Sequence, residues 1–281
     1  MLFVTRWFGV TGSDAERSLM QEQSDIKEII ERVLLMQANA AAQQQRPPLR
    51  GTHAKGVCAR AQFEVFDIAA GHGRALAPRL MKGIFTKPGK YPAIVRFANS
   101  DSKSQSDLKP DVRSLSFSVD LTRNGTADPA ASFPRQDFSL QNTKTLPIND
   151  ARAFLAIIKL LTASKPAAGL WSLPFKDKLR VLRILALLQP QAHQKIKPYQ
   201  LLHYGSNVPF RHGPIDVVKF FAKAAQDNPA HPLQRSNPNA LQDELARHLK
   251  EDGQMSSFDF GVQLLDVGRM TYWGQRRDAK K

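Results

Sequence analysis

Apolar residues near the start of the chain recur at helical spacing. Between residues 22 and 46 they stand three or four positions apart, as Ile26 and Ile29 do, with charged residues between them. This spacing places the apolar side chains on one face of a helix. The Pro47-Pro48 pair should end the helix, because proline lacks a backbone N–H and clashes with the preceding turn. We therefore expect residues 1–46 to form a helical arm and a linker.

From Thr52 onward the period falls to two, which is the spacing of strands. Up to about Leu121, apolar residues alternate with serine and aspartate, so one face of the strand at 112–121 would be apolar and the other polar. A second strand is expected at 93–97, after the turn sequence 88–92. Turn residues separate such segments at hairpin distances. The pattern predicts an antiparallel sheet or barrel.

Helical spacing returns in the centre of the chain. Asn149-Asp150 can cap a helix that runs to Leu161, and a second helix is expected at Lys176–Leu188. One broad apolar face is expected on this second helix: Leu179, Leu182, Ile184, Leu185 and Leu188. Three more elements complete the pattern: a strand at 217–221, a helix after Asn237-Pro238-Asn239, and a strand at 258–265.

These elements predict an α+β protein with two parts. The first is the arm and linker of residues 1–46. The second is a sheet or barrel domain over residues 47–281, with inserted helices near 150–190 and 240–251.

The chain is basic, with 40 Lys and Arg against 25 Asp and Glu and a net charge of +15. Such a surface attracts anions of many kinds. The sequence contains no arginine-rich block, aromatic RNA-binding motif or paired zinc ligands, so the charge does not indicate specific nucleic-acid recognition. We interpret it as a basic surface that keeps the protein soluble.

The single cysteine, Cys58, excludes an intramolecular disulfide and a cysteine metal cluster. We expect it to be a small residue packed within a strand. No apolar run approaches the roughly 20 residues of a transmembrane segment, and no secretory core is recognised near the start. We expect a cytoplasmic protein.

One histidine lies in a specific order of neighbours: Arg50-Gly51-Thr52-His53-Ala54-Lys55-Gly56, followed by Gln62-Phe63-Glu64-Val65-Phe66-Asp67. These segments resemble the distal haem segment of the catalase superfamily, in which R-x-x-H-A-K-G leads into a barrel strand. The resemblance covers about Arg50 to Asp150 and, more loosely, Tyr199 to Leu265. It implies a catalase-like antiparallel barrel that holds haem b, here with flanking helices and a shortened C-terminal part.

The resemblance also implies roles for the residues of the motif. His53 would be the acid–base group that takes a proton from peroxide and returns it to the departing oxygen, which suits an imidazole. Arg50 and Arg96 would pair with the haem propionates, because guanidinium groups match carboxylates. Thr52 would contribute to the cofactor site.

The sequence departs from the family pattern at three places. Ala98 stands where a serine orients the distal histidine, so other groups must position the ring. Gln141 falls on the position of the catalytic amide, with Asn142 one residue along. The R-x-x-x-Y sequence that supplies the proximal tyrosinate does not occur, and Tyr272, in an R-x-x-Y sequence, is a conceivable iron ligand. Other conceivable ligands are His72, His203, Tyr204 and His212.

Four hypotheses remain open. The first is a haem hydroperoxidase acting on hydrogen peroxide or on organic and lipid hydroperoxides. The second, which the missing tyrosine favours, is a catalase-fold haem-binding protein with weak or no turnover, so enzyme activity stays an open question. The third is a truncated copy that folds poorly and binds nothing. The fourth, suggested by charge alone, binds DNA in a salt-sensitive way without haem. A homo-oligomer is compatible with all four.

Overall fold

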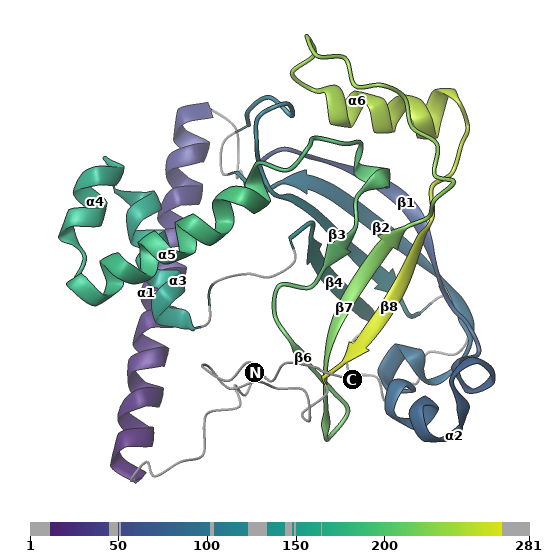
Figure 1. Cartoon of the computed structure of the whole chain (residues 1–281), viewed down its shortest axis with the longest axis horizontal. Helices are drawn as coiled ribbons and strands as arrows, with labels where there is room; N and C mark the ends of the chain where they lie inside the picture. The colour runs from purple at the N-terminus through teal and green to yellow at the C-terminus, as the bar shows by residue number, and fades with distance from the viewer. Residues whose placement is uncertain are drawn as a thin grey trace, which may run out of the picture. The chain divides into compact units, whose positions relative to one another are not determined.

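The protein is an α+β molecule with an N-terminal helix, an antiparallel curled sheet of eight strands and flanking helices (Figure 1). The computed structural model describes residues 12–44, 50, 52–101, 104–122, 134–143, 148, 150–163 and 165–265. Two compact units divide the chain: Met1–Lys55, Ser100–Ser104 and Leu146–Gln194 form the first, and Gly56–Asn99, Gln105–Thr145 and Lys195–Lys281 form the second. We call them the helical unit and the sheet unit, and each is described by itself.

The helical unit contains four helices: α1 (Gly12–Gln44), α3 (Ala151–Thr162), α4 (Pro166–Ser172) and α5 (Phe175–Ala192). The helices predicted from the spacing near 22–46, 150–161 and 176–188 are therefore confirmed, and α1 and α5 are longer than expected. The predicted cap of α3 is also confirmed, because the Asp150 carboxylate accepts a hydrogen bond from the Ala153 N–H at 2.7 Å. The sequence pattern had not indicated α4.

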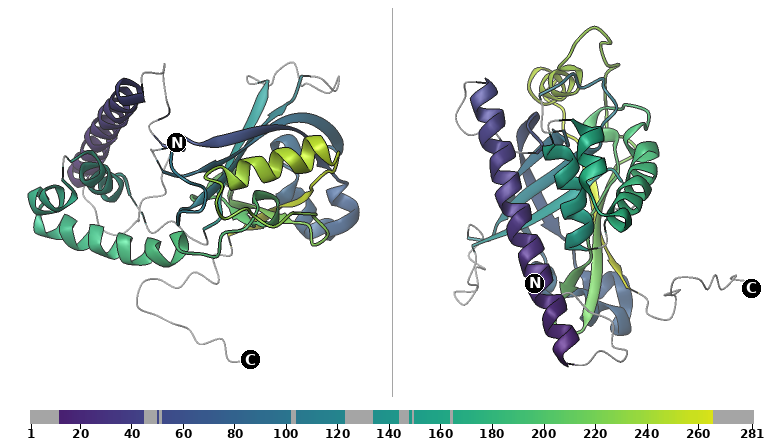
Figure 2. Two further views of the ribbon diagram at one scale, coloured as in Figure 1. Left: turned by 90° about the horizontal axis from the view of Figure 1, so that it is seen from above. Right: turned by 90° about the vertical axis from the view of Figure 1, so that its left-hand side faces the viewer.

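Helix α1 packs against α3, although more than a hundred residues separate them in the chain (Figure 2). The Arg32 guanidinium donates to the Thr162 hydroxyl at 3.0 Å, and Lys159 forms an ion pair with Glu28 at 3.0 Å. Burial opposes ionisation of Glu28, but hydrogen bonds and charge from Lys159 and Arg32 outweigh it and lower the pKa of that carboxyl. Helices α3 and α5 also bury a small apolar core, which includes Ala156, Ile157, Val181 and Ile184.

The sheet unit is built from antiparallel pairs. Its strands are β1 (Gly56–Val65), β2 (Gly89–Asn99), β3 (Arg113–Asp120), β4 (Arg135–Gln141), β5 (Tyr204–Gly205), β6 (Phe210–His212), β7 (Asp216–Ala224) and β8 (Phe258–Leu264). Strands β1 to β4 pair in chain order, β5 joins β4 to β7, β6 pairs with β7, and β8 pairs with β7. The strands predicted near 93–97, 112–121, 217–221 and 258–265 are confirmed as β2, β3, β7 and β8.

Aromatic side chains fill the inner face of the sheet. Phe63 of β1 and Phe260 of β8 belong to the two outermost strands, yet their ring centroids lie 5.4 Å apart. Phe117 and Phe138 of β3 and β4 stack between them, 4.9 Å apart. Because side chains of opposite edges touch, the sheet is curled into a half-barrel. The main apolar core of this unit lies inside the curl.

The opposite face of strands β1 to β4 is polar. Cys58 and Arg60 of β1 lie on it and are exposed, as is Ser139 of β4. The expectation that Cys58 packs within a strand is therefore wrong. Successive side chains of a strand point to opposite faces, and Cys58 has the opposite parity to Val57 and Phe63, which contribute to the inner face.

Two helices belong to the sheet unit and lie at opposite ends of it (Figure 1). Helix α2 (Ile68–Leu80) follows β1, and Asp67 caps it by accepting from the Ala69 and Ala70 N–H groups. Helix α6 (Ala240–Ala246) continues into a π-helical turn, η3 (Arg247–Glu251), which confirms the helix predicted after residue 239. Short 3-10 turns lie at η1 (Gly83–Thr86) and η2 (Tyr199–Leu201). Within the described ranges, no helix combines the length and apolarity needed to cross a bilayer.

Candidate functional site

His53 has an unusual backbone and two hydroxyl neighbours. Its φ of 57° lies in the left-handed region, where a residue other than glycine is uncommon and strained. Ring Nδ1 lies 3.2 Å from the Thr52 hydroxyl oxygen, and Nε2 lies 3.4 Å from that of Ser100. The His53 N–H donates to the Ser100 carbonyl at 3.3 Å. Hydroxyls therefore face both ring nitrogens.

The neighbours of His53 in the motif differ in exposure. Thr52 is exposed, and its hydroxyl contacts the His53 ring. Arg50 is exposed. Lys55 is buried, with 7% of its surface exposed, and the Ala54 N–H donates to the Asp101 carbonyl at 3.2 Å. The segment after His53 is thus tied to the residues that follow β2.

Gly56 leaves room for the guanidinium of Arg96. A Cβ atom at Gly56 would lie 2.7 Å from Nη2 of Arg96 and 2.5 Å from the Phe97 carbonyl oxygen, both too close for a real side chain. In the register of β1 and β2, Gly56 pairs with Ala98 and Cys58 with Arg96. The glycine of the motif therefore has a steric function, because it lets an arginine side chain lie over the strand.

Strand register places Arg96 and Gln141 on the same polar face. Arg96 pairs with Ser116 of β3, which pairs with Ser139 of β4. The next row runs from Ala98 through Ser114 to Gln141, which in turn pairs with Gly205 of β5. Two predicted site residues, the cationic Arg96 and the amide Gln141, thus share this face, which we call the serine face, and lie two strands and one row apart on it.

Asn142 has a different role from Gln141. Its side-chain oxygen accepts from the Arg113 N–H at 2.7 Å, and its own N–H donates to the Arg113 carbonyl at 2.9 Å. These two bonds close the end of the β3–β4 pair. The side-chain oxygen of Asn142 is therefore engaged in a hydrogen bond with the backbone of the sheet.

His53 belongs to the helical unit, whereas Arg96, Gln141 and Asn142 belong to the sheet unit. The structure thus brings Thr52 and His53 together in the helical unit. Arg96 and Gln141 share one face of the sheet unit, on strands that are not neighbours. The sequence did not indicate Ser100, whose hydroxyl lies 3.4 Å from the His53 ring although 47 positions separate the two residues in the chain.

The sequence also did not indicate a buried polar network at the β2–β3 loop. One oxygen of the fully buried Asp107 carboxylate accepts from the Asn99 amide at 2.9 Å, and the other accepts from the Leu241 N–H at 3.0 Å. The Arg113 guanidinium donates to the Asp107 carbonyl at 2.7 Å, and the Tyr199 hydroxyl donates to Asn99 at 2.9 Å. This network attaches the loop to the start of α6 and to η2.

The other conceivable iron ligands hold the backbone of the sheet unit. The Tyr204 hydroxyl donates to the Tyr199 carbonyl at 2.9 Å, His212 donates through Nε2 to the Leu80 carbonyl at 2.9 Å, and His203 accepts at Nδ1 from the Ala224 N–H at 3.0 Å. Tyr272 and the side chain of His72 lie outside the described residues. Among the side chains that are described, no three of His, Cys, Asp and Glu gather as a metal site.

Burial governs the ionisation of the two core tyrosines. It raises the pKa of Tyr199 far above its ordinary value, and the Asp107 charge raises it further. Burial also raises the pKa of Tyr204, with a further contribution from Tyr199. Both phenols are therefore neutral hydrogen-bond donors at physiological pH.

No protein-family model and no curated protein matches the chain.

Proposed function

We propose that the chain is a catalase-like haem-binding protein whose distal residue is His53. The observation that carries this proposal is the conformation of His53, which combines a left-handed backbone with hydroxyls at both ring nitrogens. Strain of this kind costs about 1–3 kcal/mol and persists where the surroundings enforce it, commonly at functional sites. A histidine held in this way suits acid–base chemistry.

The residues of the serine face fit one part of a haem. Gly56 provides a space that a Cβ would fill, and the Arg96 guanidinium lies against it. Such an arginine can pair with a propionate, as Arg50 could from its exposed position. For the proximal side, the Tyr204 hydroxyl is already engaged in a hydrogen bond to the Tyr199 carbonyl, and Tyr272 lies outside the described residues. The described residues therefore support the distal half of a catalase-like site.

The proposal contains two alternative functions. The first is haem binding with weak or no peroxide turnover, and the second is hydroperoxidase activity. Bound haem would supply the redox chemistry of peroxide cleavage. In the hydroperoxidase, His53 would accept a proton from the peroxide and return it to the departing oxygen, while Gln141 would donate a hydrogen bond through its amide. The second function needs His53 to exchange the long contact with Ser100 for one with the substrate.

A haem titration tests the proposal. The purified protein should develop a Soret band with a saturable, one-to-one dependence on haem. The Arg96→Ala variant should bind haem about tenfold more weakly, because a charge-assisted hydrogen bond contributes about 1.5–3 kcal/mol. Arg235→Ala is the matched control, since Arg235 is an exposed arginine of the sheet unit that lies in a loop before α6 and outside the serine face. A folded wild-type protein without a Soret band would sink the proposal.

A His53 variant separates the two functions. For a hydroperoxidase, peroxide-dependent dye oxidation should fall by a factor of about 100 or more in His53→Ala, which is the typical contribution of a positioned acid–base group. The exposed His193, at the end of α5, provides the control variant His193→Ala. Equal slow activity in wild type and His53→Ala, with haem retained, would instead select the haem-binding protein.

A further inference from the structure

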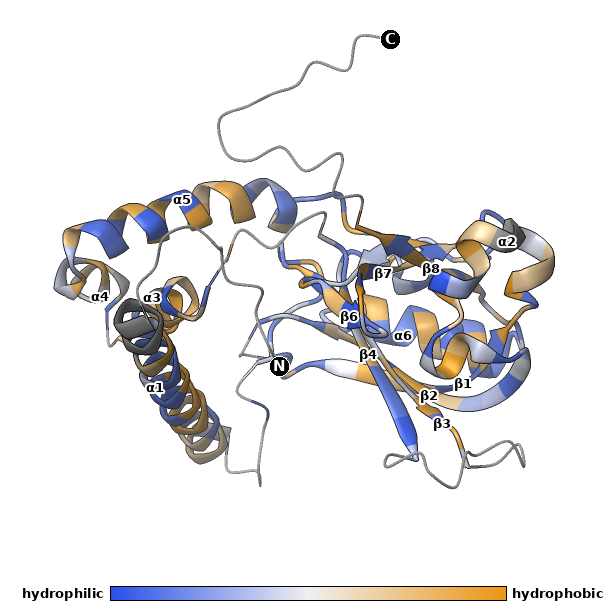
Figure 3. Ribbon diagram, turned by 90° about the horizontal axis from the view of Figure 1, so that it is seen from below, coloured by the Kyte–Doolittle hydropathy of each residue, from blue (hydrophilic) through white to orange (hydrophobic). Residues whose placement is uncertain are grey.

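Helix α5 is apolar on two opposite faces. One face is buried against α3 and includes Val181 and Ile184, which are 0% and 3% exposed. On the other side Phe175, Leu179 and Leu182 are 74%, 52% and 50% exposed. Their spacing of four and three residues places them in one stripe along the helix. Figure 3 shows the alternation of apolar and polar segments along α5.

Cations line the edges of this exposed stripe. Between residues 166 and 192 the chain has four cationic residues and one acidic residue, a net charge of +3 by subtraction. The cations are Lys176, Lys178, Arg180 and Arg183. The acid, Asp177, is 7% exposed and forms ion pairs with Arg152 and Arg180 at 3.4 Å. The charge that α5 presents to solvent is therefore positive.

Helix α4 adds an aromatic ring beside the stripe. Trp171 is 78% exposed, and the Lys178 ammonium lies 5.1 Å from the centre of its ring. Tryptophan is enriched at the boundary between lipid headgroups and acyl chains, because its ring is apolar and its N–H is polar. Together, Trp171, Phe175, Leu179, Leu182 and the four cations form what we call the α4–α5 surface.

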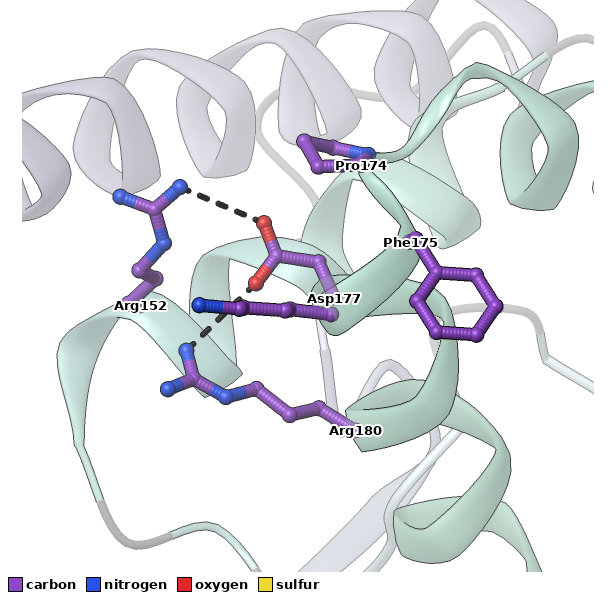
Figure 4. A pocket seen from close by; sticks show the side chains of 6 residues that line it. Arg152, Pro174, Phe175, Asp177 and Arg180 are labelled. Carbon is purple, nitrogen blue, oxygen red and sulfur yellow. Dashed lines mark hydrogen bonds and ion pairs between the residues drawn. The ribbon is translucent and has the colours of Figure 1, made fainter.

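A pocket lies at the end of this surface, at the start of α5 (Figure 4). It has a volume of about 350 Å³ and lies entirely within the helical unit. Its lining combines three cations, one carboxylate and two apolar residues: Arg152, Lys176, Arg180, Asp177, Pro174 and Phe175. Figure 4 shows Arg152 and Arg180 reaching Asp177 from two helices. The three cations and one carboxylate give the lining a net charge of +2, but Arg152 and Arg180 are paired with Asp177 and the surface that faces the pocket is almost entirely apolar.

We propose that the α4–α5 surface docks on an anionic lipid bilayer. The apolar stripe and Trp171 would enter the headgroup region, and the flanking cations would contact lipid phosphates and carboxylates. Helices that lie in a membrane interface have this composition, with large apolar residues on one side and lysine or arginine beside them. The positive charge of the surface disfavours a second copy of the same surface, because like charges would face each other. Nucleic acid would match the charges but not the exposed apolar stripe.

Vesicle co-sedimentation tests the proposal with the full chain. The protein should bind vesicles of phosphatidylcholine with phosphatidylserine and bind those of phosphatidylcholine alone much more weakly. Phe175→Ser should reduce the partition coefficient by about tenfold, because it removes the burial of an aromatic side chain. Lys176→Gln should reduce it by about fivefold, since each cation near an anionic surface contributes roughly 1 kcal/mol.

Two control variants match these changes in the sheet unit. Ile215→Ser removes an apolar residue that is 87% exposed, and Lys87→Gln removes an exposed cation of the loop before β2. Both should bind vesicles as the wild type does. All four positions are exposed, so circular dichroism should show an unchanged fold.

Three outcomes would overturn the proposal. One is equal binding to anionic and neutral vesicles, or none. Another is a loss of binding in the control variants as large as in Phe175→Ser and Lys176→Gln. The third is salt-sensitive binding to duplex DNA that Lys176→Gln weakens and Phe175→Ser leaves unchanged, together with no vesicle binding, which would assign the surface to nucleic acid.

Discussion

At the scale of single residues, the structure gives a local reason for two positions of the motif, His53 and Gly56. His53 has a left-handed backbone, and hydroxyl groups contact both nitrogens of its ring. Gly56 lacks the Cβ that would collide with Arg96 and with the Phe97 carbonyl. The order of residues in the motif thus has a structural reason that does not depend on a bound cofactor. This makes the motif testable through stability as well as through haem binding.

The Gly56→Ala substitution should destabilise the protein by about 1–3 kcal/mol, because one of the two atoms in the way belongs to the rigid backbone of β2. The matched control is Gly71→Ala in α2, where nothing lies within 4 Å of the added Cβ. That change should stabilise the protein by up to about 1 kcal/mol, as alanine does within helices. Urea denaturation of both variants measures the difference. Equal midpoints would contradict the packing described for Gly56.

The sequence predicted part of the candidate site and missed the rest for physical reasons. The motif identified His53 and Arg96 by resemblance, and strand alternation is enough to place Arg96 and Gln141 on one face. Ser100 was missed because a hydroxyl contact across a loop has no periodic signal. Asp107 was missed because its contact with Asn99 crosses a loop without a periodic signal, and its other partner, Leu241, is distant in the chain.

At the scale of elements, α5 shows the limit of apolar spacing as a guide. The expected single apolar face comprised Leu179, Leu182, Ile184, Leu185 and Leu188. In the structure Ile184 is buried against α3, whereas Leu179 and Leu182 lie on the opposite, exposed side. Periodicity identifies the helix, but it does not say which apolar side packs when both sides are apolar. By contrast, β3 was predicted closely, because only one of its faces is apolar.

Substitutions at two nearby positions of α5, Leu182 and Ile184, should therefore have unequal effects on stability. Ile184→Ala removes a side chain that is 3% exposed and should cost about 2–5 kcal/mol, through lost burial and a residual cavity. Leu182→Ala, at 50% exposure, should change the free energy of unfolding by no more than about 0.5 kcal/mol. Thermal denaturation of the two variants checks the assignment of the faces. A larger loss in Leu182→Ala than in Ile184→Ala would show that the exposed stripe packs against another part of the protein.

At the scale of the whole molecule, local sequence patterns predicted the α+β class and the antiparallel sheet. They did not predict which helices pack against each other. Spacing alone predicted an N-terminal arm at 1–46, but α1 packs against α3 through Arg32, Glu28 and their partners in α3. Contacts between distant segments depend on shape and charge that no local period encodes. The curl of the sheet could not be predicted from local patterns either, since it depends on phenylalanines from five strands that meet inside it.

The global stability of the molecule should depend on alkaline pH through its core tyrosines. Burial raises the pKa of Tyr199 and Tyr204 above their value in the unfolded chain, which is about 10. The stabilisation from keeping these phenols neutral is complete below pH 10 and is lost as pH rises above it, because only the unfolded chain then releases the protons. Each tyrosine should lower the free energy of unfolding by about 1.4 kcal/mol per pH unit in that range.

The Tyr199→Phe variant tests this dependence. At pH 8 it should be less stable by about 1–3 kcal/mol, because the Asn99 side-chain oxygen loses its buried donor. Between pH 10 and 11, however, its stability should fall by about 1 kcal/mol less than that of the wild type, since one buried phenol is gone and that phenol is already half ionised in the unfolded chain at pH 10. Urea denaturation at pH 8, 10 and 11 gives both quantities. Parallel loss of stability in the two proteins would show that Tyr199 ionises in the folded state and that the network around Asp107 is open to solvent.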